Sequence, residues 1–96
     1  MPSQKVRVLI VDDDPSMSRF LSSYLTRQNY EVSTAASGEE AIRMFRVYDP
    51  ALVLLDMAMT GMDGLDTLER LKQIKPEVSI IVVSGQNSPD LIFRAS

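Results

Sequence analysis

Apolar residues along the chain fall into four short runs, separated by segments in which they recur at helical spacing. The runs cover residues 6–11, 30–36, 51–55 and 78–83, and they have the length of strands. The first, third and fourth are nearly continuous and rich in Val, Ile and Leu, a pattern typical of strands that are covered on both faces. The second run contains more polar residues and is a weaker strand signal. We therefore predict four strands.

The segments between these runs predict amphipathic helices. Asp14 and Pro15 offer an N-cap followed by proline at the first helical position. Ser37 and Glu40 form a capping box before a second helix. The apolar faces of the three predicted helices are Met17, Phe20, Leu21, Tyr24 and Leu25, then Ala41, Met44, Phe45 and Tyr48, then Leu65, Leu68, Leu71 and Ile74. The pairs Asp49-Pro50 and Lys75-Pro76 predict the ends of the second and third helices.

Strands that alternate with helices through short connections predict right-handed βαβ units, and hence a doubly wound α/β fold with a parallel sheet. In such open sheets, binding sites form outside the carboxyl ends of the strands. Ser88-Pro89-Asp90 predicts the start of a fourth helix, and the chain ends six residues later at Ser96. We therefore expect the chain to stop within that helix.

Composition narrows the possible chemistry. The 96 residues are 45% hydrophobic and 24% charged, the balance of one small globular domain, and they include no Cys and no His. Disulfides, thiol nucleophiles and imidazole bases are therefore excluded. The formal charge of −3 disfavours direct binding to nucleic acid or anionic lipid. No apolar run is long enough to span a bilayer and the polar start does not resemble a signal peptide, so we expect a cytoplasmic protein.

Acidic residues follow two of the predicted strands. Asp12 and Asp13 come after the first, and Asp56 comes after the third. If these strands are neighbours, three carboxylates meet at one sheet edge, where two unit charges about 4 Å apart repel by roughly 4 kcal/mol at an effective dielectric constant of about 20. Such a cluster shares protons or holds a cation, and a ligand set made of oxygen alone favours Mg²⁺ or Mn²⁺. A metal beside an Asp oxygen is suited to phosphoryl transfer.

Each of these residues also has a plainer interpretation. Asp14 is well placed as the helix cap, and Asp12 with Asp13 could be an acidic turn, although two charges directly after a buried strand are costly without a purpose. Asp56 could begin a turn, and Ser84 precedes a glycine in a common turn signal. Met57, Met59 and Met62 are interpreted as loop and core filler.

Together, these motifs resemble a known family. Leu-Ile-Val-Asp12-Asp13-Asp14-Pro, then Leu-Leu-Asp56-Met-Ala-Met-Thr-Gly-Met-Asp-Gly64, then Val-Val-Ser84-Gly85, are similar to the receiver domain of two-component response regulators. The resemblance is collinear over the whole chain. It implies the flavodoxin-like fold with strand order 2-1-3-4.

The resemblance also implies roles for individual positions. Asp56 matches the phosphoacceptor, which attacks a phosphohistidine on a sensor histidine kinase or phosphotransfer protein. Asp12 and Asp13 match the pair that holds Mg²⁺, and Ala58 matches the position whose backbone carbonyl also binds the ion. Ser84 matches the hydroxyl that senses the phosphoryl group, and Gly85 matches the small residue beside it. The implied protein is a signalling switch that catalyses at most its own phosphorylation and dephosphorylation.

The sequence departs from the family at two places. Thr60 stands where proline is usual. A receiver also continues with a fifth strand, which ends in a phosphoryl-contacting lysine, and a last helix, and no residue here matches that lysine. We therefore expect residues 1–96 to be an incomplete receiver that is impaired as a phosphoacceptor, and that self-associates through the exposed edge of its fourth strand.

Three other functions remain open from the sequence. Asp12-x-Asp14 after a strand, with Ser84 at another strand end, resembles the haloacid-dehalogenase-type phosphatases, but Pro15 and the lack of a role for Asp56 disfavour that interpretation. A receiver-like interaction module without phosphate is disfavoured because all three carboxylates and Ser84 are retained. A flavin or nucleotide site is disfavoured because three negative charges follow the first strand.

Overall fold

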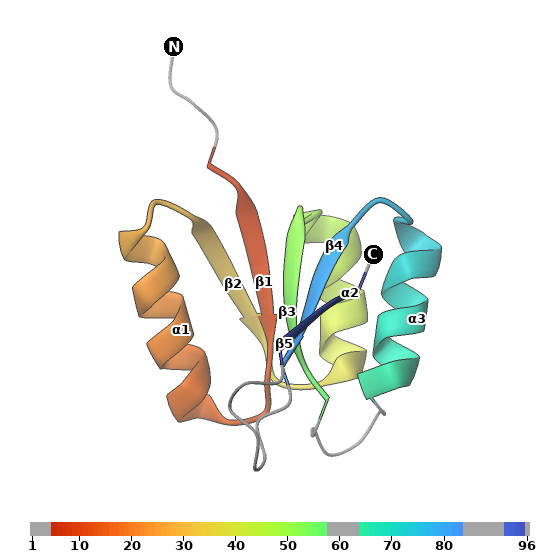
Figure 1. Cartoon of the computed structure of the whole chain (residues 1–96), viewed down its shortest axis with the longest axis horizontal. Coiled ribbons are helices and arrows are strands. Elements are labelled where there is room, and N and C mark those ends of the chain that lie inside the picture. The colour runs from red at the N-terminus through yellow and green to blue at the C-terminus, as the bar shows by residue number, and fades with distance from the viewer. Residues whose placement is uncertain (1–4, 58–63, 84–91, 96) are drawn as a thin grey trace.

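The computed structural model describes residues 5–57, 64–83 and 92–95, and within these ranges strands alternate with helices along most of the chain (Figure 1). The elements are β1 (Arg7–Val11), α1 (Pro15–Arg27), β2 (Glu31–Ala35), α2 (Gly38–Tyr48), β3 (Leu52–Asp56), α3 (Gly64–Ile74), β4 (Ser79–Val83) and β5 (Ile92–Ala95). The four strands and three helices predicted from the apolar pattern are therefore all present.

The strands form one sheet in the order β2-β1-β3-β4-β5, and the first four of these are parallel. This confirms the doubly wound α/β fold and the order 2-1-3-4. The helices lie on both faces of the sheet (Figure 1). Phe45 of α2 and Leu71 of α3 pack with Leu9, Val53 and Ile80 in the core on one face, and α1 packs against β1 and β2 on the other.

Local hydrogen bonds explain where the first two helices begin. The Asp14 side chain accepts a hydrogen bond from the Ser16 N–H at 3.0 Å and caps α1, as the sequence predicts. The Ser37 Oγ accepts from the Glu40 N–H at 3.1 Å and caps α2. The Glu40 carboxylate in turn accepts from the Ala36 N–H at 2.7 Å, so both partners of the predicted capping box bind backbone amides.

The strand β5 corrects two predictions from the sequence. Residues 92–95 pair antiparallel with β4, with Val83 opposite Ile92, instead of continuing a fourth helix. The expected exposed edge of β4 is therefore wrong, because β5 covers it, whereas the self-association inferred from that edge stays a prediction. A helix nucleus of a few residues is unstable by itself, whereas the edge of β4 offers a row of amide and carbonyl groups to pair with. Residues 88–91 lie outside the described ranges.

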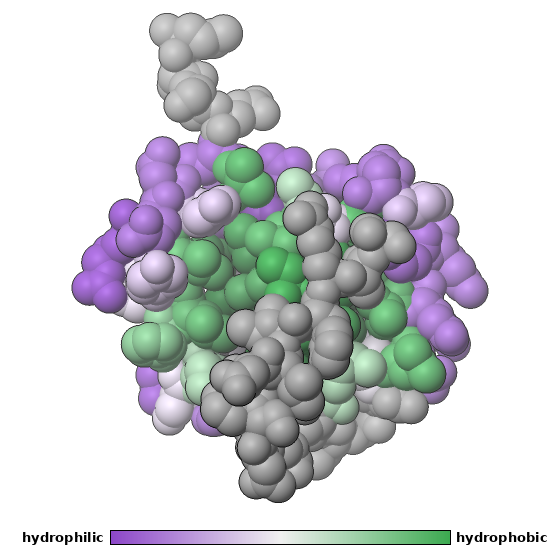
Figure 2. All heavy atoms as spheres, viewed as in Figure 1, coloured by the Kyte–Doolittle hydropathy of each residue, from purple (hydrophilic) through white to green (hydrophobic). Residues whose placement is uncertain are grey.

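The two faces of the sheet differ in how well they are covered. On the face shared with α1, apolar side chains gather between the helix and β4 (Figure 2). Met17, Phe20 and Tyr24 of α1 are exposed, with Phe20 at 64%, and Leu54 of β3 is only half-buried. The residues packed between the sheet and the α2–α3 layer are almost fully enclosed. Among the described residues, none of the helices combines the length and apolar character needed to cross a membrane.

Candidate functional site

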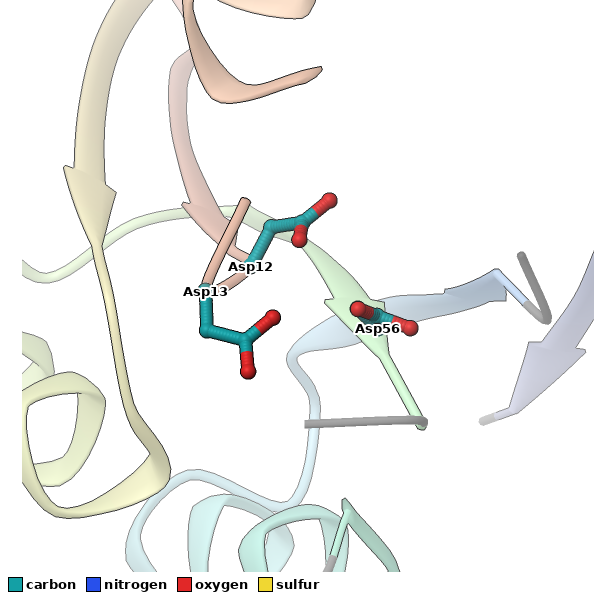
Figure 3. A group of neighbouring side chains, drawn as sticks. All are labelled: Asp12, Asp13 and Asp56. Carbon is teal, nitrogen blue, oxygen red and sulfur yellow. The ribbon is translucent and has the colours of Figure 1, made fainter. Parts of the chain in front are cut away.

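Three acidic side chains meet at the carboxyl end of the parallel strands. Asp12 and Asp13 follow β1 directly, and Asp56 is the last residue of β3. One carboxylate oxygen from each residue lies within 4.8 Å of the others. Figure 3 shows the three side chains around a shared space, approached from two neighbouring strands. The structure thus brings together the three carboxylates that the sequence singles out.

The parallel register of β1 and β3 creates this arrangement. Val11 is paired with Leu55, so the residues that follow each of them leave the sheet side by side. Asp12 is held further by its own backbone, because its N–H donates to the Ala35 carbonyl at 3.0 Å. Its Oδ1 accepts a hydrogen bond from the Asp14 N–H at 2.9 Å, which fixes the direction of the carboxylate.

The electrostatics of the cluster favour a bound cation. Partial burial of the Asp12 carboxyl and the negative charge of Asp56 together raise its pKa to about 6, against the lowering effect of the hydrogen bond from the Asp14 amide. Ionising the Asp12 carboxyl beside Asp56 therefore costs free energy. A divalent cation reverses that balance, and a donor set made of carboxylate oxygens suits Mg²⁺.

The other residues predicted for the site are not among those the structure describes. Ala58, Ser84 and Gly85 lie outside the described ranges, so their roles remain predictions. Asp14 takes the capping role that the sequence gives it. Met57 packs against the core cluster, in agreement with its interpretation as filler.

Two neighbours of the site are not identified by the sequence pattern. Ser18 is a buried polar residue of α1, and its hydroxyl donates to the Asp12 carbonyl at 3.4 Å. Gly64 is buried at the start of α3, where its backbone lies against Met57, the residue after Asp56. A serine among polar helix positions gives no sequence signal, and a glycine before a helix is equally typical of an ordinary loop.

The comparison with protein families identifies the domain that carries this acidic cluster. A family model described as the response regulator receiver domain matches residues 8–96. The chain belongs to this family. It is therefore a receiver domain, the phosphorylatable switch of two-component signalling, and the acidic cluster lies within the matched region.

Individual proteins of known name are also similar to this chain. The receiver domain is 42% identical over 84 residues to the probable transcriptional regulator ycf27 of Pyropia yezoensis, an alignment that covers 88% of this chain and 34% of the relative. It is 34% identical over 90 residues to the chemotaxis protein CheY of Thermotoga maritima, covering 93% of this chain and 75% of that protein. The chain thus spans about a third of the ycf27 relative and most of the chemotaxis protein.

Solved structures share the fold. The chemotaxis protein CheY4 of Vibrio cholerae superposes with a TM-score of 0.82 at 27% identity, over 91% of this chain and 74% of that one. The response regulator protein TrrA of Thermotoga maritima, solved in complex with Mg²⁺-BeF, superposes with a TM-score of 0.80 at 34% identity, over 85% of this chain and 71% of that one. A member with similar architecture was therefore solved with a magnesium-containing ligand.

Proposed function

We propose that Asp56 accepts a phosphoryl group in a Mg²⁺-dependent reaction, and that Asp12 and Asp13 hold the ion. The observation that carries this proposal is the meeting of the three carboxylates, with one oxygen from each within 4.8 Å of the others. The donor is a phosphohistidine on a sensor histidine kinase or phosphotransfer protein. The proposal includes a cytoplasmic location and no direct contact with nucleic acid or membrane.

The chemistry follows from the position of Asp56 at the end of β3. A carboxylate oxygen of Asp56 attacks phosphorus, a P–O bond forms, and the P–N bond to the histidine breaks. The imidazole leaves with the electron pair of that bond and takes up a proton. When bound, Mg²⁺ neutralises the charge that develops on the phosphoryl oxygens.

The described residues prepare this reaction by fixing charge and direction. The bond from the Asp14 amide orients the Asp12 carboxylate, and the raised pKa of Asp12 means that cation binding competes with a proton below about pH 6. The neighbouring Asp13 supplies a second, more exposed carboxylate. Together they form an acidic site that binds the ion beside the nucleophile.

We place the remaining roles at the positions that the family resemblance assigns. The backbone carbonyl of Ala58 completes the metal site, and the Ser84 hydroxyl turns toward the phosphoryl group while Gly85 leaves it room. Phosphorylation adds charge to Asp56, so it changes the electrostatic balance of the sheet edge and is relayed as a conformational change. The protein catalyses at most its own phosphorylation and dephosphorylation.

The phosphatase alternative assigns a different nucleophile. It would require Asp12 to attack and Asp14 to act as the acid. Asp14 instead caps α1 through its side chain, and Asp56 shares the site with Asp12. These contacts favour Asp56 as the acceptor.

Intact mass spectrometry after incubation with acetyl phosphate and Mg²⁺ tests the proposal. We expect a reduced extent of uptake, of at most one phosphoryl group, on the unmodified chain. We expect none on Asp56→Asn, and the same reduced extent on Glu69→Gln, which alters an exposed carboxylate of α3. The same measurement on a version extended to a full domain gives the reference extent. Equal uptake by Asp56→Asn would overturn the proposal, and uptake lost only in Asp12→Asn would support the phosphatase alternative.

A further inference from the structure

The start of α3 lies unusually close to the backbone that follows Asp56. A Cβ atom built on Gly64 would lie 2.8 Å from the Met57 Cα and 3.3 Å from the Met57 carbonyl oxygen. It would also lie 2.7 Å from the Met57 Sδ. The sulfur could swing aside, but the Cα could move only together with the chain. Any side chain at position 64 therefore displaces either α3 or the backbone beside the nucleophile.

Met57 is also held by a hydrogen bond to β4. Its N–H donates to the Val83 carbonyl at 3.2 Å, at the end of β4. A displacement of the Met57 backbone would strain or break this hydrogen bond. The residue after Asp56 is thus fixed between the first residue of α3 and the last residue of β4.

The identity of residue 64 is hard to explain by the helix alone. Inside helices glycine is among the least favourable residues and alanine the most favourable, and nothing in helix stability requires glycine at the first position. The residue is buried and is the first of the helix. The close approach to Met57 supplies a reason for glycine that local helix stability does not.

We propose that Gly64 is a positioning residue for the phosphoacceptor, because the missing side chain lets α3 pack directly against Met57 and so fixes Asp56 relative to Asp12 and Asp13. This inference rests on the proposed function, since it concerns the geometry of the same metal and phosphoryl site. A small displacement matters there, because the three carboxylates must reach one ion at the same time.

The first test compares two substitutions in α3. Gly64→Ala introduces the Cβ, and Leu68→Ala removes packing from the same helix without adding an atom near Met57. Mg²⁺ affinity is measured by titration calorimetry, and stability by urea unfolding. We expect Gly64→Ala to weaken Mg²⁺ binding by about tenfold or more, and Leu68→Ala to change it little even where it lowers stability more.

The outcomes separate this inference from the proposed function. Absence of Mg²⁺ binding by the unmodified chain would overturn both. Normal binding by the unmodified chain together with equal binding by Gly64→Ala would overturn only the role of Gly64. Equal losses in the two variants would show a merely structural role and would also overturn it.

A second test does not depend on the metal. Amide hydrogen exchange by NMR follows the Met57 N–H, which we expect to lose protection in Gly64→Ala and to keep it in Leu68→Ala.

A third test, by Mg²⁺ affinity, separates the side chain of Met57 from its backbone. The double variant Gly64→Ala with Met57→Ala removes the sulfur contact but leaves the contact with the Cα. We expect no recovery of Mg²⁺ affinity, and recovery would show that the side chain, not the backbone, sets the position.

Discussion

The two ends of the parallel sheet handle charge in opposite ways. At the carboxyl end, Asp12, Asp13 and Asp56 bring like charges together. At the amino end, the Asp49 carboxylate lies 2.9 Å from the Lys75 Nζ and 3.7 Å from the Arg7 Nη2. The Arg7 side chain also donates to the Asp49 carbonyl at 3.2 and 3.3 Å. Among the described residues, the amino end pairs its acid with two basic side chains, whereas the carboxyl end places three carboxylates together.

The pKa shifts express the same difference. Burial, followed by the charge of Asp56, raises the pKa of the Asp12 carboxyl to about 6. The hydrogen bond and charge of Lys75, helped by Arg7, lower the pKa of the Asp49 carboxyl. The comparison teaches that folding favours the ionised form of Asp49 and opposes the ionised form of Asp12. A site that opposes its own ionisation is ready to bind Mg²⁺.

The largest effect is expected when a ligand is removed from the carboxyl end. Asp13→Asn should weaken Mg²⁺ binding by more than about tenfold, because it takes one carboxylate from the cluster. Asp14→Asn is the matched control, since asparagine also caps helices and the change removes a nearby charge without touching the cluster. Titration calorimetry measures both. If Asp13→Asn and Asp14→Asn bind Mg²⁺ alike, the assignment of the metal site is wrong.

Without metal, removing charge from the same end should stabilise the fold. Asp12→Asn should raise the free energy of unfolding at about pH 7 by about 1 kcal/mol, because solvent screens much of the repulsion around this half-exposed group. Since the pKa of Asp12 is higher in the folded state than in the unfolded state, the unmodified protein loses stability as the pH rises from about 4 to about 6. The variant lacks this contribution.

Urea unfolding in a chelator across this pH range measures the difference, with Glu69→Gln as the control for an exposed carboxylate. Saturating Mg²⁺ should reverse the sign, since a ligand that binds only the folded state stabilises the unmodified protein more. A variant that is less stable than the unmodified protein under both conditions would contradict the electrostatic account of the site.

Removing a charge from the amino end should lower the stability of the fold, and by less than the change expected at the carboxyl end. Asp49→Asn keeps a residue that tolerates the left-handed backbone at φ 52°, and it removes only the charge. We expect a small loss of stability at neutral pH. Because the folded-state pKa of Asp49 is lowered, this difference should vanish as the pH falls through that value. Thermal unfolding from neutral to acid pH checks this, and a loss that persists in acid would show that the charge is not its cause.

The smallest expected effect is that of salt, which should reduce the stability changes caused by Asp12→Asn and by Asp49→Asn. Raising KCl from about 0.1 M to about 1 M shortens the Debye length from about 10 Å to about 3 Å. The gain from Asp12→Asn should shrink by a few tenths of a kcal/mol, and the loss from Asp49→Asn should shrink as well. Unfolding of the three proteins in a chelator at both salt concentrations provides the measurement. Differences that grow with salt would point to packing instead of charge.

Most of the sheet could be predicted because its signals are local. The apolar runs mark β1, β2, β3 and β4 to within one residue at either end, and parallel pairing then places the acidic residues at one edge. The antiparallel pairing of β5 could not be predicted, since it depends on the free edge of β4 and not on the periodicity of residues 92–95. The Lys75–Asp49 contact joins residues 26 apart, and no sequence pattern links them.

The acidic cluster could be predicted from the sequence, but the packing that supports it could not, for a related reason. Two strand ends followed by acid are visible in the sequence, so Asp12, Asp13 and Asp56 could be grouped before the structure was known. The contact of Gly64 with Met57 depends on how far α3 approaches the sheet. That distance follows from the packing of the whole α2–α3 layer, which no single residue encodes.

The pairing of Val11 with Leu55 makes the site sensitive to insertions and deletions. Side chains alternate between the two faces of a strand, so one inserted residue in β3 would send every later side chain to the opposite face and move Asp56 out of step with Asp12. Substitutions within the strands can preserve the count of residues that aligns these carboxylates. Changes in length can be absorbed in the connections that lie away from this edge of the sheet. The strands β1 and β3, by contrast, must each keep five residues.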